Sequence, residues 1–357
     1  MKVHIRFLIN IFFKSFFYVL TVMMSLVFIL NLLGELDFFR DLDVTTNFTL
    51  FLSLLNSPAM IFEMFPFIFL ITTQLFFIKL FNNNEIHIFK YSGLKNSKIL
   101  TVLSLVSLFT GILIISFFYN LSSSFKNFYL ELKSQHTNDG KYLAVVTKNG
   151  LWIRDKVDNK ILVINSSKIE QNYLIGNFIT EFDKDYNVLR NIKSDKIDIS
   201  KKEWKIYESK TFIKNNYTLK KQEILLTNFD YKRIQSLYSN LSSLNIFELH
   251  ELKKNYKKLN YSTTEVNLQL LKLITNPVYF FLMTIFSSLI MLKIRQIESS
   301  TFKISLGLFF SVVIYYINNF FFVLGSTERI SIELSIFLPL TMLTITNGIM
   351  FYKINEK

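Results

Sequence analysis

The sequence contains no cysteine, only four histidines and only nine glycines among its 357 residues. Without cysteine the chain cannot form disulfides, bind zinc or an iron–sulfur cluster through thiolates, or use a thiol nucleophile. Four histidines leave little capacity for a metal site, so no metal is expected. The sequence has no phosphate-loop, H-E-x-x-H or G-x-S-x-G pattern. We therefore expect neither a cofactor nor catalysis by this chain alone.

Apolar side chains, by contrast, are abundant. Hydrophobic residues make up 50% and aromatic residues 16% of the chain, with 39 phenylalanines, and the mean hydropathy is +0.31. This composition is too apolar for a single soluble globule, whose surface needs more polar side chains. The formal net charge of +13 predicts an anionic partner, which could be phospholipid headgroups, nucleic acid or another polyanion. The positions of the charges must distinguish these partners.

Six apolar stretches are long enough to cross a hydrocarbon core of about 30 Å as helices. They cover approximately residues 15–33, 60–81, 99–119, 268–292, 304–324 and 332–352. Three precede and three follow a long polar interval. The sequence therefore predicts an α-helical membrane protein with six transmembrane helices in a three-plus-three arrangement.

The short segments between these stretches differ in charge. One set is mainly basic and contains Lys2, Arg6, Lys90, Lys95, Lys98, Lys293, Arg295, Lys303, Lys353 and Lys357. The other set is mainly acidic and contains Glu35, Asp37, Asp41, Asp43, Glu328 and Glu333, against Arg40 and Arg329. Because lysine and arginine collect on the cytosolic side of a membrane, we expect both termini in the cytosol and the interval 121–267 outside it.

The polar interval reads as a folded domain. Residues 121–270 contain 25 lysines and arginines and 17 acidic residues, a mixture typical of a solvated surface. Expected strands cover residues 142–147, 151–154, 160–165, 173–182, 188–192 and 204–212, which are rich in β-branched and aromatic side chains. Short strands separated by turn signals predict an all-β sandwich or jelly roll. Interleaved acids and an external location argue against nucleic acid as a partner.

Residues 82–93, between the second and third spans, predict a short cytosolic helix. Asn82 can cap it, Glu85 would sit at the third helical position, and Gly93 can supply a left-handed C-terminal residue. Ile86 and Phe89 lie three residues apart on one face. The helix could rest on lipid headgroups. Alternatively, it could be presented to a cytosolic partner such as an ATPase.

Several motifs together resemble the LptF/LptG lipopolysaccharide-export permease family. The matching segments are Phe65-Pro66, Asn84-Glu85-Ile86, Tyr91-Ser92-Gly93-Leu94, residues 149–155 (NGLWIRD), Asn276-Pro277 and Phe337-Leu338-Pro339. They follow the family's order, and the likeness covers essentially the whole chain. The segment 54–58 (LLNSP) followed by Phe65-Pro66 is more similar to LptG than to LptF.

The resemblance implies an architecture and a set of partners. It divides the chain into residues 1–120, with three spans and a coupling helix at about 82–93, a periplasmic jelly-roll-like domain at 121–266, and three further spans at 267–357. It implies a permease in the bacterial inner membrane that extracts lipopolysaccharide. The implied partners are the paired permease LptF, a dimer of the ATPase LptB, and the bridge proteins LptC and LptA.

The resemblance also assigns residues. It implies that Glu85, Ile86, Phe89 and Gly93 couple the permease to the ATPase. It also implies that the first and fifth spans form lateral gates, where lipid enters. The candidate gate residues are Phe17, Met24, Phe28, Phe309, Tyr316 and Phe320. Other members place basic side chains near the outer end of the first span against lipid phosphates. Here Glu35 and Asp37 dominate that place, and Arg40 is the one basic candidate.

Alternatives to these assignments stay open at the level of sequence. Glu85 could simply cap its helix, and each apolar gate residue could serve ordinary helix packing. The chain could be the LptF paralogue of the same complex. It could also be a permease that drives a periplasmic domain mechanically without moving lipid, or a membrane sensor that needs no ATPase.

Overall fold

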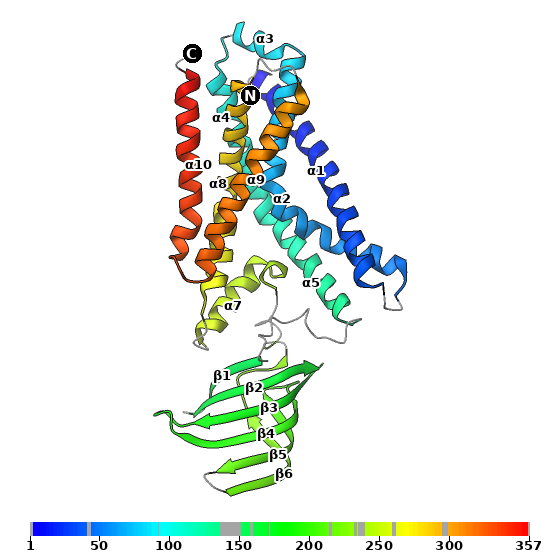
Figure 1. The fold of residues 1–357 in the computed structure, drawn as a ribbon, viewed down its shortest axis with the longest axis vertical. Coiled ribbons are helices and arrows are strands. Elements are labelled where there is room, and N and C mark those ends of the chain that lie inside the picture. Colours follow the sequence, from blue (N-terminus) through cyan, green and yellow to red (C-terminus); the bar gives the residue numbers. More distant parts are fainter. Residues whose placement is uncertain are drawn as a thin grey trace. The chain divides into compact units, whose positions relative to one another are not determined.

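The computed structural model describes residues 3–40, 44–91, 93–135, 151–157, 160–170, 172–213, 216–231, 234, 240–258, 262–294 and 299–355. The chain divides into two compact units, each described here by itself (Figure 1). The first comprises Met1–Lys126 and Thr264–Lys357 and is helical. The second comprises Asn127–Thr263 and contains the sheet.

Within the described residues, six helical segments are long and apolar enough to cross a membrane, which confirms the predicted number. The third segment is continuous from α4 through a π-helical stretch, η1, into α5. The elements are α1 (Val3–Phe38), α2 (Thr46–Asn82), α4 (Asn96–Leu113), η1 (Ile114–Tyr119), α5 (Asn120–Gln135), α8 (Thr264–Lys293), α9 (Ser300–Ser326) and α10 (Ile332–Asn355).

Most of these helices are longer than the apolar stretches that predicted them. α1 begins at Val3 rather than near residue 15, and α2 begins at Thr46 rather than near residue 60. A hydropathy window marks only the part of a helix that lies in hydrocarbon. The backbone hydrogen bonds continue into the flanks, and in α2 the helix runs on through Pro58 and Pro66.

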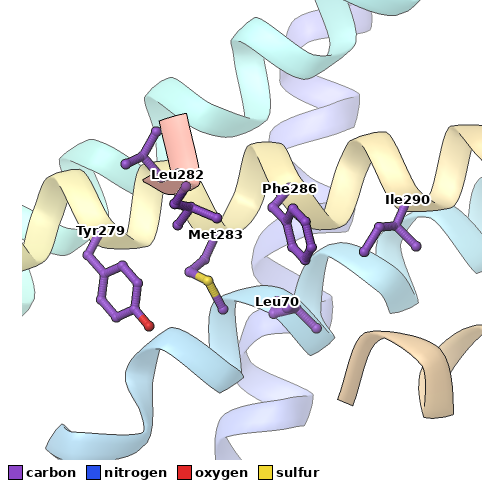
Figure 2. Packing of buried hydrophobic residues seen from close by; sticks show 7 residues of the cluster. Leu70, Tyr279, Leu282, Met283, Phe286 and Ile290 are labelled. Carbon is purple, nitrogen blue, oxygen red and sulfur yellow. The ribbon is translucent and has the colours of Figure 1, made fainter. Parts of the chain in front are cut away.

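Helices α2 and α8 form the centre of the helical unit. In the most apolar part of each helix, 72% of the α2 residues and 78% of the α8 residues are buried. The corresponding shares are 22% for α1 and 11% for α9. Phe69 of α2 stacks on Phe280 of α8 with ring centroids 5.0 Å apart. A second apolar cluster lies along α8 (Figure 2) and combines Leu70 of α2, Leu343 of α10 and, from α8 itself, Tyr279, Leu282, Met283, Phe286 and Ile290. α1 and α9 are therefore peripheral helices.

The second unit contains one antiparallel sheet of six strands. Its strands are β1 (Leu151–Val157), β2 (Lys160–Glu170), β3 (Tyr173–Phe182), β4 (Val188–Asp198), β5 (Glu203–Ile213) and β6 (Asn216–Leu226). Each strand pairs with the next along the chain, so the order of the described strands is that of a meander (Figure 1). The inserted β domain is confirmed, and the term jelly roll fits the described strands only loosely. The expected strand at 142–147 lies outside the described residues.

One face of the sheet is buried and mixes apolar with charged side chains. Ile164, Ile179 and Ile192 lie opposite one another on β2, β3 and β4 and are fully buried. On the same face Arg190 of β4 donates to both carboxylate oxygens of Glu181, at 2.7 and 2.8 Å, and to Glu223 of β6 at 2.5 Å. Paired strands thus bring three charged groups together, and their mutual hydrogen bonds offset the cost of burying them.

Among its described residues the second unit also includes helical segments, namely the end of α5, the 3₁₀ turn η2 (Leu241–Ser243) and α7 (Ile246–Lys258). The chain then returns to the helical unit at Thr264, the first residue of α8.

Candidate functional site

The short helix α3 (Glu85–Tyr91) connects the end of α2 to the start of α4. It lies at the end of the helical unit that also holds the start of α1 and the end of α10 (Figure 1). A helix of seven residues is too short to be stable by itself, so its conformation depends on its ends and on the neighbours against which it packs.

The N-terminal end of α3 differs from the prediction. Asn82 is the last residue of α2, and α3 begins at Glu85, so Asn82 does not cap α3 and Glu85 is not its third residue. The break lies at Asn84, whose backbone is left-handed with φ 56°. The Asn83 side-chain amide donates to Glu85 Oε1 at 3.2 Å. Asparagine tolerates the left-handed region, which explains why α2 can run on to residue 82 before the chain turns.

The C-terminal end of α3 follows the prediction. Gly93 has φ +77°, a conformation that side chains with a Cβ rarely adopt. The Leu94 N–H donates to the Phe89 carbonyl oxygen at 2.9 Å, which closes the last turn of the helix. Gly93 therefore fixes the direction in which the chain leaves α3 toward α4.

The side chains of α3 divide between an inner and an outer face. Ile86 is only 1% exposed, and Phe89 is half-buried with its ring edge-on to Phe7 of α1, centroids 6.0 Å apart. Ile88 and Tyr91 are 61% and 90% exposed. Ile86 and Phe89 thus hold α3 onto its own chain, and the outer face presents Ile88 and Tyr91. The resemblance assigns Ile86 to coupling with the ATPase, and within this chain its side chain is buried.

A groove of about 970 Å³ runs between α3, the start of α1 and the start of α4. It is lined by apolar residues such as Phe7 and Phe89 and by the charged side chains of Glu85, Lys95 and Lys98. Glu85 is half-buried there. Its Oε1 accepts from Asn83, whereas its Oε2 is buried without a hydrogen-bond partner among the described residues. An unsatisfied carboxylate oxygen beside an apolar groove is a strong acceptor for a donor supplied by another molecule.

The candidate gate residues lie on the two peripheral helices, both of which pack on α2. Phe17 of α1 and Phe309, Tyr316 and Phe320 of α9 are each 60% to 66% exposed. Packing within this chain therefore does not account for these four aromatic side chains. Met24 and Phe28 of α1 are half-buried, and Arg40 is exposed beyond the end of α1.

A partly exposed charged pair between two helices was missed from the sequence. Lys272 of α8 lies 3.5 Å from Glu63 of α2, in a small pocket that Asn318 and Asn319 of α9 also line. The Lys272 ammonium also lies 5.3 Å from the centroid of the Phe322 ring. The sequence did contain a signal, namely one acidic and one basic residue within two otherwise apolar spans. Because an isolated charge in a membrane is costly, such residues are expected to pair. Their pairing depends on helix packing, which sequence does not give.

Among the described residues no group of three or more histidine, aspartate or glutamate side chains could hold a metal ion. The geometry consists instead of an exposed helix at one end of the bundle and outward-facing aromatic surfaces on its flanks. Such an arrangement can bind a protein at the end of the bundle and apolar molecules or helices at its sides.

A comparison with curated proteins finds no match for the chain. The family model described as "Lipopolysaccharide export system permease LptF/LptG" matches residues 6–353, from the first turn of α1 to the last turn of α10. Such a match covers both halves of the helical unit and the inserted sheet, in agreement with six membrane-spanning helices and a β domain between the third and fourth. The chain belongs to the LptF/LptG family of lipopolysaccharide-export permeases.

Proposed function

We propose that the chain is the LptG-type permease of an ABC transporter that extracts lipopolysaccharide from the bacterial inner membrane and passes it to a periplasmic bridge. The observation that carries the proposal is the family match over residues 6–353. In this proposal the paired permease is LptF, two copies of LptB hydrolyse ATP, and LptC and LptA receive the lipid. Both termini are cytosolic, and the β domain is periplasmic.

Coupling to ATP hydrolysis is assigned to α3. Its outer face offers Ile88 and Tyr91 to a partner, and Glu85 offers a carboxylate oxygen that has no partner among the described residues. Ile86 and Phe89 anchor the helix to α1 and to the rest of the bundle, and Gly93 sets its exit. A push on α3 reaches α2 directly, because only Asn83 and Asn84 separate the two helices.

Lipid entry is assigned to the outer surfaces of α1 and α9. The exposed aromatic side chains Phe17, Phe309, Tyr316 and Phe320 would meet acyl chains or the paired permease, with Met24 and Phe28 beside them. Arg40 is the one candidate there for a lipid phosphate. Export then follows because the transporter has two states that bind the lipid with different affinity. ATP binding closes the LptB dimer, and α3 carries the motion to the spans. The lipid is then expelled toward the β domain.

The first test is purification of the chain in mild detergent with whatever it binds. Recovery of a second six-span permease and an ATPase is the expected result, and the identity of that permease separates LptG from LptF. Recovery of the chain without an ATPase would favour a membrane sensor and contradict the proposal. A complex that hydrolyses ATP without releasing lipopolysaccharide would favour mechanical transmission instead.

The second test reverses one charge on α3. In the purified complex we expect Glu85→Lys to uncouple ATP hydrolysis from lipopolysaccharide release without preventing membrane insertion, because the Glu85 carboxylate is one of the groups that α3 is proposed to offer to the ATPase. Glu333→Lys is the matched control, since Glu333 is an exposed acid in the first turn of α10. Unaltered transport by the Glu85→Lys complex would discredit the assigned contact.

A further inference from the structure

An apolar cavity of about 500 Å³ lies between α8, α9 and α10. Its walls include Phe286 and Ile290 of α8, Phe310 and Ile314 of α9, and Leu343 and Met350 of α10. Phe286 and Ile290 belong to the row of α8 side chains seen in Figure 2. The volume falls within the range of about 300–1,000 Å³ that small-molecule sites occupy.

The cavity follows from the way α9 packs. The buried residues of α9 in its first half are Lys303, Gly307 and Ser311, a narrow stripe of four-residue spacing. The Gln74 side chain of α2 reaches this stripe and donates to the Lys303 carbonyl oxygen at 2.8 Å. A neighbouring apolar stripe of α9 faces α8 and α10 and is only partly buried. On α10, Pro339 lies at the cavity wall. α9 is thus held against α2 and leaves a slot beside α8 and α10.

The two ends of the slot differ chemically. Lys293, the last residue of α8, lines one end, and Tyr279 and Asn318 line the other. Lys293 and Tyr279 are fourteen residues apart on one helix, which corresponds to about 21 Å at ~1.5 Å per residue. Half of a hydrocarbon core is about 15 Å thick. The apolar length therefore accommodates one lipid chain that enters from the membrane surface beside Lys293.

We propose that this cavity binds one acyl chain of an anionic phospholipid, with its phosphate beside the Lys293 ammonium. The lipid comes from the leaflet that borders Lys293, which is the cytosolic leaflet in the proposed orientation. A lysine near a membrane surface attracts anionic lipid. The apolar cavity next to Lys293 shields the acyl chain of that lipid from neighbouring lipids. The site depends on the membrane location of the helices and not on lipopolysaccharide transport, so it can be tested separately.

The test uses a phosphatidylglycerol probe with a photoreactive group in the middle of one acyl chain. The full chain, with any partners that co-purify, is placed in vesicles of phosphatidylethanolamine and phosphatidylglycerol, and labelled peptides are identified by mass spectrometry. We expect labels on the α8 and α10 walls of the cavity, at residues such as Phe286, Ile290 and Leu343. Labels confined to outward-facing α9 residues would show bulk lipid alone and overturn the proposal.

Matched variants separate the cavity from the surrounding lipid. Leu306→Trp fills the slot from α9 and should abolish the cavity labels, whereas Val312→Trp, on an exposed position of the same helix, should leave them unchanged. If Leu306→Trp fails to fold, Met350→Trp and its exposed neighbour Ile349→Trp provide the same comparison on α10. Equal cavity labelling in both members of a pair would overturn the proposal.

The role of Lys293 is tested with a second probe. Replacing Lys293 by Gln should lower phosphatidylglycerol labelling about fivefold, the loss expected for one basic residue near an anionic headgroup. A phosphatidylcholine probe with the same photoreactive chain should label both forms equally. Undiminished phosphatidylglycerol labelling of Lys293→Gln would contradict the headgroup contact and with it the choice of an anionic lipid.

Discussion

At the scale of single residues, Gln74 shows how a polar group is accommodated inside an apolar bundle. Its side chain is fully buried, and its Nε2 donates to the Lys303 carbonyl oxygen at 2.8 Å, whereas its Oε1 has no hydrogen-bond partner among the described residues. The amide fits because Gly307 has no side chain: a Cβ at that position would overlap the Gln74 amide. One hydrogen bond and one glycine thus set how closely α9 approaches α2.

Gly307→Ala is expected to lower the stability of the helical unit by about 1–3 kcal/mol, the usual cost of overpacking. The new methyl group must displace Gln74 and break its hydrogen bond. Gly348→Ala is the control, because a Cβ on Gly348 meets no atom within 4 Å. Thermal unfolding in detergent measures both, and Gln74→Ala should largely rescue Gly307→Ala in a double-mutant cycle. Equal stabilities of the two alanine variants would contradict the account.

The charged cluster of the sheet predicts a dependence on pH. Burial raises the pKa of Glu223, but the hydrogen bond and charge of Arg190 outweigh it and hold that pKa below its usual value. A carboxylate with a lowered folded pKa stabilises the folded state above its unfolded pKa, about 4.3, and this contribution is lost as pH falls through the folded pKa. The β unit should therefore lose stability below about pH 4.

Arg190→Gln should destabilise the β unit by about 1–3 kcal/mol at neutral pH, because two buried carboxylates lose their guanidinium partner. It should also reduce the acid dependence due to Glu223, whose pKa Lys220 and Thr211 lower as well. The two tryptophans, Trp152 and Trp204, lie in the β unit, so fluorescence during denaturation reports on this unit alone. Lys193→Gln, an exposed cation on the same strand, is the control. An unchanged pH profile in Arg190→Gln would contradict the assigned pairing.

Local sequence predicts some residue roles and not others. Gly93 was predicted to be left-handed because few other residues adopt that conformation at a helix end. Asn82 was wrongly predicted to cap α3, because a capping preference says nothing about how far the preceding helix continues. The ion pair of Glu63 with Lys272 joins residues about two hundred positions apart and could not be read from either segment alone.

At the scale of elements, the proposed function divides α3 into an anchoring face and a face that recognises the ATPase. Ile86→Ala removes a buried side chain and should weaken the attachment of α3 by about 2 kcal/mol. Ile88→Ser changes an exposed side chain and should leave unfolding unaltered while lowering affinity for the ATPase severalfold. Thermal unfolding and binding titration in detergent separate the two effects. Loss of stability in Ile88→Ser, or full affinity in that variant, would contradict the division of α3 into two faces.

The elements also show where sequence patterns lose precision. β6 escaped prediction because its middle, Lys220-Lys221-Gln222-Glu223, lacks the apolar alternation of a half-buried strand. Most of β6, an end strand of the described sheet, is exposed. The spans were found because apolar residues dominate each of them, even where Glu63 and Lys272 interrupt two of the runs. Their ends were missed because the helices continue beyond the most apolar stretch.

At the scale of the whole molecule, order along the chain predicts what no single motif does. Three apolar helices, a β domain and three more apolar helices occur in that order, and the family model matches from residue 6 to residue 353. In the proposed topology a single span, from α4 to α5, separates α3 from the β domain, so the two are proposed to lie on opposite sides of the membrane. The proposed mechanism requires that arrangement, because the ATPase must act on one side and the lipid must leave on the other.

The absence of cysteine makes this arrangement directly measurable. Tyr91→Cys on α3 and Lys184→Cys in the turn between β3 and β4 each introduce a single exposed thiol. In spheroplasts treated with a membrane-impermeant maleimide, Lys184→Cys should be labelled at once and Tyr91→Cys only after the membrane is permeabilised. Labelling of both variants from the same side would contradict the proposed topology and the transport mechanism that depends on it.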